Sequence, residues 1–184
     1  MTVRANAGPD SEPEWGAALA AAARGADPLL RVVSGPAAVA AAFGGRQPVY
    51  VATPYSREVV GPDGRWDHHL SVVAMLRAAA AADDLLACGV TALSPIVQAA
   101  AMVHGAMRGA AGGVSVHRHD PLDGALWQRW CAPVLRVCGA LVVPDLPGWD
   151  RSWGIWHEFN AALAANMPVF LYAPQGVSVT GEGR

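Results

Sequence analysis

From residue 47 onward, short apolar runs alternate with longer segments whose apolar residues recur every three or four positions. The runs have the length of buried strands, and turn residues bound each of them. They cover residues 49–52, 89–93, 139–144 and 168–172. The segments between them are predicted to be helices. They cover residues 66–86, 96–107, 121–137 and 152–166.

Strands that alternate with helices predict an α/β fold. We expect a doubly wound, Rossmann- or flavodoxin-like sheet of about five mostly parallel strands, with helices on both faces. Such folds bind ligands beyond the carboxyl ends of the strands. Pro133 lies inside the segment 121–137 and is expected to kink or divide that helix.

The first 46 residues follow a different pattern. Residues 1–14 are polar and rich in glycine and proline, which predicts a loose tail. Residues 15–24 read as a short alanine-rich helix, and residues 27–45 as an accessory strand and helix. We therefore divide the chain into a tail with an accessory segment, residues 1–46, and an α/β domain, residues 47–184.

Composition narrows the classes of function. Of the 184 residues, 53% are hydrophobic and 15% are charged, which is typical of a chain with one packed core. All 13 basic residues are arginine, and the net charge is −2. The lack of lysine excludes Schiff-base chemistry, pyridoxal phosphate attachment and a P-loop lysine. With no excess of basic residues, a nucleic acid polymer is not an expected partner.

Cysteine spacing and hydropathy bear on the compartment. The three cysteines form no CxxC pair, and the first residues lack the apolar core of a signal peptide. Residues 85–107 hold no Asp, Glu, Lys or Arg, but Ser94 and Pro95 interrupt them, so we expect a strand and a helix rather than a membrane span. The run His117–x–His119–Asp120 lacks a further ligand at metal-site spacing. These features predict a cytoplasmic protein without a metal site.

The ends of the predicted strands hold the candidate chemistry. Glu158 falls near the second turn of a helix that begins around Ser152, where the helix dipole favours an ionised carboxylate. Ser152 can cap that helix or donate to an anion, and Gly154 lets a ligand approach the backbone. Other polar and aromatic residues follow the strands. They are Thr53, Pro54 and Tyr55 after the first strand, Ser94 after the second, and Trp149, Asp150 and Trp153 after the third.

Three of these segments, taken in order, resemble the nucleoside 2-deoxyribosyltransferase-like superfamily. They are residues 49–56, 93–96 and 148–158. Within the superfamily the chain looks most like the DUF1937 group, which shares the Ala-Thr-Pro-Tyr-Ser strand end and the Gly-Trp-x-x-Ser-x-Gly-x-x-x-Glu segment. The resemblance covers about residues 47–173 and leaves the first 46 unmatched.

The resemblance implies cleavage of an N-glycosidic bond without a cofactor. Glu158 matches the family's nucleophile, and Tyr50 matches the tyrosine that orients that carboxylate. At the position of Ser152, free-nucleoside transferases tend to carry an acidic residue and nucleotide N-glycosidases a serine that contacts a 5'-phosphate. We therefore expect a nucleoside 5'-monophosphate N-glycosidase, with a nucleoside 2-deoxyribosyltransferase and a non-catalytic nucleotide-binding module as the alternatives.

Two positions depart from the family pattern. Cys131 stands where the family usually has an aspartate that passes a proton to the leaving base, and Gly139 replaces a related aspartate. Asp150, His157, the His119–Asp120 pair or water are the candidates for this proton. These departures favour the non-catalytic alternative.

The remaining predicted site residues have roles that the sequence leaves open. Trp149 and Trp153 either stack on a base or sugar, or pack in the core or between subunits. The substrate-binding set also includes Thr53, Pro54, Tyr55, Ser94, Asp150, Ser152 and Gly154. The resemblance implies a small nucleotide or nucleoside as the partner and a homodimer or higher homo-oligomer.

Overall fold

The structure is a computed structural model and describes residues 13–108 and 119–173. It contains one five-stranded sheet with the order β1-β5-β4-β2-β3, and every neighbouring pair of strands is parallel. This confirms the doubly wound α/β fold expected from the sequence. The strands are β1 (Leu30–Val33), β2 (Val49–Val51), β3 (Ala92–Leu93), β4 (Ala140–Val143) and β5 (Val169–Tyr172).

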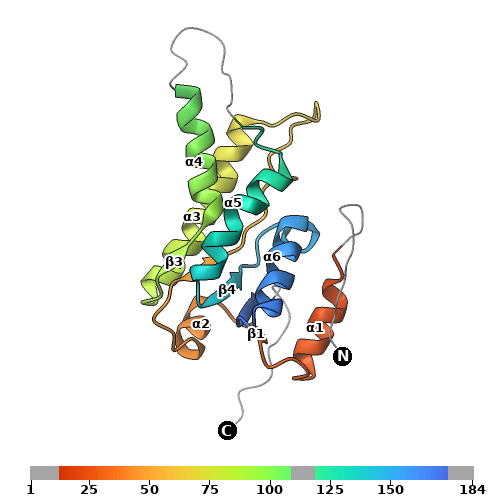
Figure 1. Ribbon diagram of the computed structural model, residues 1–184, viewed down its shortest axis with the longest axis vertical. Helices are drawn as coiled ribbons and strands as arrows, with labels where there is room; N and C mark the ends of the chain where they lie inside the picture. The colour runs from red at the N-terminus through yellow and green to blue at the C-terminus, as the bar shows by residue number, and fades with distance from the viewer. Residues whose placement is uncertain (1–12, 109–118, 174–184) are drawn as a thin grey trace.

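Helices cover both faces of the sheet (Figure 1). One face packs against α1, α5 and α6, and the other packs against α2 and α3. The remaining helix, α4, packs against α3 and α5. The helices are α1 (Trp15–Ala23), α2 (Pro36–Ala42), α3 (His68–Ala87), α4 (Pro95–Arg108), α5 (Gly124–Val137) and α6 (Trp153–Ala164), with a 3₁₀ turn η1 (Trp149–Arg151) before α6.

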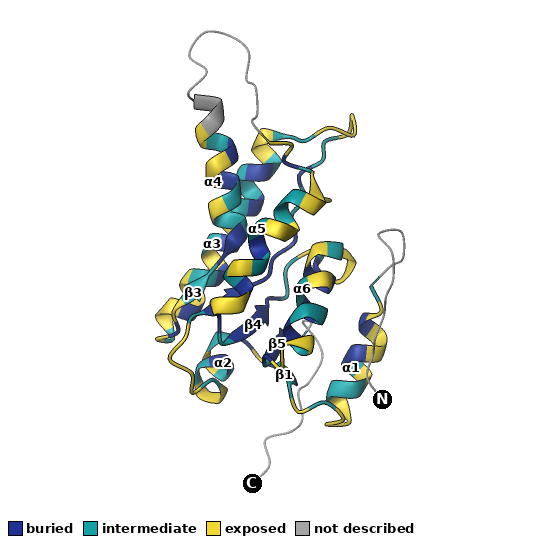
Figure 2. Ribbon diagram, in the orientation of Figure 1, coloured by how far each residue is buried: buried dark blue, intermediate teal, exposed yellow. Residues whose placement is uncertain are grey.

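The central strands are apolar along their whole length because both of their faces are covered. In β2, Val49 and Val51 pack on the α2–α3 side, whereas Tyr50 packs on the α5–α6 side. The four residues of β4 alternate in the same way and are all buried. Figure 2 shows these strands as the buried centre of the molecule. This arrangement explains why the sequence shows continuous apolar runs there rather than alternation.

The N-terminal segment is part of the same sheet and core. Its predicted accessory strand is β1, which forms the edge of the sheet beside β5. Its predicted helix, α1, places Trp15 against Trp149, Trp156 and Phe159. The accessory segment therefore packs on the part of the chain that carries α6. Most of the predicted tail and His117 lie outside the described residues.

Of the two effects expected at Pro133, a kink or a division of the helix, the division does not occur. Helix α5 runs from Gly124 to Val137 with Pro133 inside it. A proline removes one backbone hydrogen bond of a helix, and Cys131 and Leu135 on either side are buried in the core. These contacts hold the helix on the sheet on both sides of Pro133. No helix in the described parts of the chain is long and apolar enough to cross a membrane.

The strand order creates a switch point between β2 and β4. From β2 the chain continues outward to β3 at one edge, and from β4 it continues to β5 on the other side. The connections that leave β2 and β4 therefore diverge to opposite sides, which opens a crevice beyond their carboxyl ends. The residues that follow these two strands include the candidate site residues around Thr53 and Ser152.

Candidate active site

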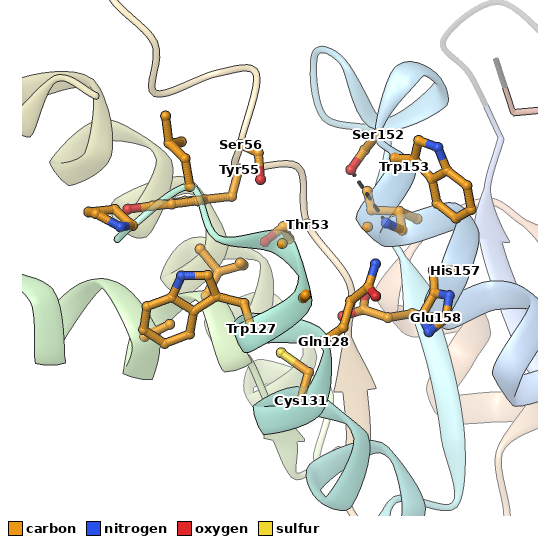
Figure 3. Close-up of a pocket in the computed structure, with 18 of the residues that line it drawn as sticks. Thr53, Tyr55, Ser56, Trp127, Gln128, Cys131, Ser152, Trp153, His157 and Glu158 are labelled. Carbon is orange, nitrogen blue, oxygen red and sulfur yellow. Dashed lines mark hydrogen bonds between the residues drawn. The ribbon is translucent and has the colours of Figure 1, made fainter. Parts of the chain in front are cut away.

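A cavity of about 610 Å³ lies at this switch point (Figure 3). This volume is in the range of small-molecule sites. Its wall combines residues that follow β2, one side of α4, the first half of α5 and the start of α6. The residues used below are Thr53, Tyr55, Ile96, Ala99, Val103, Leu122, Trp127, Gln128, Cys131, Ser152, Trp153, Gly154, His157 and Glu158.

Glu158 and Tyr50 meet at the wall of the cavity. Tyr50 lies on β2, is 1% exposed, and donates a hydrogen bond through its hydroxyl to Oε1 of Glu158. Glu158 is half-buried on α6 and lines the cavity. Its neighbours Trp156 and Phe159 are buried against the sheet side, which fixes the rotation of α6 about its axis. The carboxylate is thus held by the helix and by the central strand together.

The surroundings of this pair favour its neutral, protonated forms. Burial raises the pKa of Glu158 to about 7, and the hydrogen bond from Tyr50 opposes that rise. Burial and the nearby Glu158 charge raise the pKa of Tyr50 far above its usual range. Burial, followed by the same charge, raises the pKa of Cys131 to about 11. Near neutral pH, Tyr50 is therefore a donor, Cys131 is a thiol, and Glu158 is close to half ionised.

The start of α6 forms another part of the wall. Ser152 caps the helix, since its Oγ accepts from the backbone N–H of Ile155 at 3.4 Å. Gly154 also lines the cavity, and a Cβ placed there would meet only Ser152 Oγ, at 3.8 Å. Free backbone N–H groups and the positive end of the helix dipole favour an anion here. The geometry suits a phosphate or carboxylate close to the backbone.

Two further polar atoms at the cavity have no hydrogen-bond partner among the described residues. They are Oγ1 of Thr53, whose residue is 5% exposed, and Nε1 of Trp153. Buried polar atoms are normally paired, so these two atoms are exceptions in the described part of the protein. Arginine is absent from the described wall, so an anion there would be bound by neutral donors.

Several predicted site residues lie outside the cavity wall. Trp149 is buried, and its ring centroid lies 4.8 Å from that of Trp15, which is the core packing that the sequence left open as the alternative to stacking on a ligand. Asp150 is exposed on η1, and Ser94 and Pro54 are buried; none of the three lines this cavity.

The structure also adds residues that the sequence reasoning did not place at the site. Gln128 and Trp127 line the cavity from α5. Gln128 precedes Cys131 by one helical turn, which is the signal that points to a shared face. His157, one of the candidate proton donors, lines the cavity beside Glu158, whereas His119 and Asp120 do not line it. In the described parts of the chain, no three His, Cys, Asp or Glu side chains are grouped as a metal site.

The family of the chain follows from a comparison with known families. The family model described as Domain of unknown function (DUF1937) matches residues 47–174, which include β2 to β5 and the whole described wall of the cavity. Comparisons with curated proteins and with solved structures found no match. The chain belongs to the DUF1937 family.

Proposed function

We propose that this member of the DUF1937 family is a nucleoside 5'-monophosphate N-glycosidase that uses Glu158 as its nucleophile. The observation that supports this most directly is the hydrogen bond from Tyr50 to Glu158 at the wall of the cavity. A carboxylate held in one orientation beside a cavity is what an attack on a sugar carbon needs. The resemblance to the nucleoside 2-deoxyribosyltransferase-like superfamily points to the same two residues.

The chemistry proceeds in two displacement steps. The ionised Glu158 forms a bond to the anomeric carbon while the bond from that carbon to the base nitrogen breaks, and the base leaves with the electron pair. Water then attacks the same carbon, gives its hydroxyl to the sugar and loses a proton, and Glu158 leaves as a carboxylate. Tyr50 keeps its own proton and orients Oε1 throughout.

The start of α6 is the part of the cavity that would bind the phosphate of the substrate. Ser152, the open backbone at Gly154 and the unpaired hydroxyl of Thr53 line the same cavity as Glu158. Hydrogen-bond donors at a helix start bind phosphate without a cation. This arrangement supports a nucleotide over a free nucleoside as the substrate.

The leaving base needs a proton. The described residues of the cavity wall reduce the number of groups that could donate it. Cys131 is a weak acid because burial raises its pKa to about 11. Asp150 and the His119–Asp120 pair do not line the cavity. Exposed His157 and solvent water remain as donors.

A non-catalytic nucleotide-binding module is the second candidate. The thiol of Cys131 in place of a stronger acid favours it, and so does the raised pKa of Glu158, which leaves part of the carboxyl neutral at pH 7. A nucleoside 2-deoxyribosyltransferase is the nearest catalytic variant, with a second base in place of water.

Release of free base from a panel of ribo- and deoxyribonucleoside monophosphates, measured by chromatography, tests the proposal. We expect release by the wild-type protein and by the control variant Asp83→Asn, which changes an exposed carboxylate on α3. Glu158→Gln keeps the shape of the side chain and should lower the rate by about a thousandfold or more, because an amide is a poor nucleophile.

The same assay separates the alternatives. Equal release by Glu158→Gln and wild type contradicts the proposed mechanism. Exchange into an added second base in place of hydrolysis indicates a transferase. Nucleotide binding in calorimetry with no base release over days indicates the non-catalytic module.

A further inference from the structure

The cavity has two chemically different ends. Figure 3 places Tyr55 and Trp127 on one side and Ser152, Trp153 and Glu158 on the other. The end at α6 carries the carboxylate of Glu158 and the start of the helix at Ser152. The opposite end, here called the apolar end, is formed by two aromatic rings and aliphatic side chains of α4 and the segment before α5. It consists of Tyr55, Ile96, Ala99, Val103, Leu122 and Trp127.

Contacts within the protein already engage the polar atoms of the two aromatic residues. The Tyr55 hydroxyl accepts from Nε1 of Trp66 at 3.1 Å and shares a hydrogen bond of 2.7 Å with Oγ of Ser71. Ser71 is fully buried, and its hydroxyl also bonds Nε2 of His104 at 3.0 Å. These bonds anchor the Tyr55 hydroxyl between α3 and α4 and leave its ring for the cavity.

Trp127 is held in a comparable way. Its Nε1 donates to the backbone carbonyl oxygen of Asp120 at 3.1 Å. The two aromatic residues of the apolar end therefore present ring surface, and the other described residues of that end have only hydrocarbon side chains. Ser56, beside Tyr55 in Figure 3, adds a hydroxyl to the described wall next to this end. A base edge buried there would leave its amide or amino groups unpaired, which lowers affinity on the order of tenfold for each group.

Apolar groups, in contrast, bind more tightly when they are buried at the apolar end. A buried methylene group contributes about fourfold in affinity. We propose that the base of the substrate carries an apolar substituent, which lies at the apolar end between Tyr55 and Trp127. This inference rests on the proposed function for the orientation of the substrate, with the sugar at Glu158 and the base toward α4.

Two matched pairs of nucleotides test the inference. They are adenosine 5'-monophosphate with its N6-benzyl derivative, and deoxyuridine 5'-monophosphate with its 5-butyl derivative. Base release gives kcat/KM, and calorimetry on the Glu158→Gln variant gives Kd. We expect at least one substituted nucleotide to have a kcat/KM at least tenfold higher than its parent and a Kd at least tenfold lower.

A pair of variants on α4 locates the substituent. Ala99→Leu adds bulk to the apolar end, whereas Ala101→Leu adds the same bulk to an exposed position outside the wall. Ala99→Leu should remove most of the preference for the substituted nucleotide, and Ala101→Leu should keep it. Equal losses for parent and substituted nucleotides in Ala99→Leu would contradict the assigned location.

The outcomes distinguish this inference from the proposed function. Base release at equal rates from both members of both pairs overturns the inference and leaves the glycosidase intact. Tenfold tighter binding of a substituted nucleotide without any release supports the inference and contradicts the glycosidase. Equal or absent binding together with no release contradicts both.

Discussion

The hydroxyl of Tyr50 on β2 donates to the carboxylate of Glu158 on α6, although 108 positions separate the two residues in the sequence. The side chain of Tyr50 is buried under α5 and α6, so it is held in place and in turn holds the more exposed carboxylate in one orientation. The bond joins one strand of the switch point to the helix that follows the other. It decides which way Glu158 faces and how readily Glu158 ionises.

Removal of this hydroxyl should shift the pH dependence of base release. Burial holds the pKa of Glu158 at about 7 against the lowering effect of Tyr50. A hydrogen bond to a charged group contributes about 1.5–3 kcal/mol, so Tyr50→Phe should raise this pKa by about one unit or more. Because the nucleophile must be ionised, release at pH 7 should fall by about fivefold or more and recover at higher pH.

The measurement is a profile of kcat/KM from pH 5 to pH 9. Tyr172→Phe is the control, since Tyr172 lies on β5 and packs on the α2–α3 side of the sheet, and its hydroxyl has no partner among the described residues. Its profile should follow that of the wild type. An unshifted profile for Tyr50→Phe would show that Tyr50 does not tune the carboxyl.

Glu158 should also make the stability of the protein depend on pH. Its folded pKa of about 7 lies above its ordinary value of 4.5, so between these values the folded state binds more protons than the unfolded state. The free energy of unfolding therefore falls as pH rises from about 4.5 to 7 and is level above that range, with a total loss of up to about 3 kcal/mol.

Glu158→Gln cannot ionise and should lack this loss. Urea unfolding of both proteins at half-unit steps from pH 4.5 to pH 8 gives the difference between their stabilities. The variant should gain on the wild type up to about pH 7. A constant difference across the range is the result that contradicts the raised pKa.

A charge at position 152 should change the preferred substrate. Aspartate caps helices as well as serine does, so Ser152→Asp should keep α6 in place while it adds a carboxylate at the wall of the cavity. Repulsion should lower kcat/KM for a nucleoside monophosphate by about tenfold or more. The free nucleoside should be affected little.

Ser152→Ala is the matched neutral variant. It loses the cap and one donor but adds no charge, so its loss for the monophosphate should be smaller than that of Ser152→Asp. Equal losses for nucleotide and nucleoside in Ser152→Asp would indicate that the phosphate binds elsewhere.

Trp15 should be important for stability although it precedes the family match. It is 5% exposed, and its ring centroid lies 4.8–4.9 Å from those of Trp149, Trp156 and Phe159. Removal of a buried tryptophan side chain costs about 3–5 kcal/mol, which lowers Tm by about 10 °C in a protein of this size. Differential scanning calorimetry of Trp15→Ala checks this, with Trp15→Phe expected to lose less. A change in Tm of only a degree or two for Trp15→Ala would mean that α1 contributes little to the core.

The sequence was sufficient for the parts that depend on local pattern. Short continuous apolar runs bounded by turn residues are typical of strands covered on both faces, and this predicted β2, β4 and β5 and hence the α/β class. Ser152 and Glu158 follow β4 in an order that places them at the start and in the second turn of one helix. These local relations hold whatever the other elements do, because helix periodicity and capping depend on residues a few positions apart.

Tertiary structure decided which residues share a space. Only the packing of α1 on α6 placed Trp149 in the core, and only the rotation of α5 brought Gln128 and Trp127 to the cavity. The contact of Tyr50 with Glu158 and the engaged hydroxyl of Tyr55 likewise depend on the order of the strands and the docking of α3 and α4. Side chains distant in sequence come into contact only because whole helices and strands pack against one another. The spacing of residues within a short segment does not determine that packing.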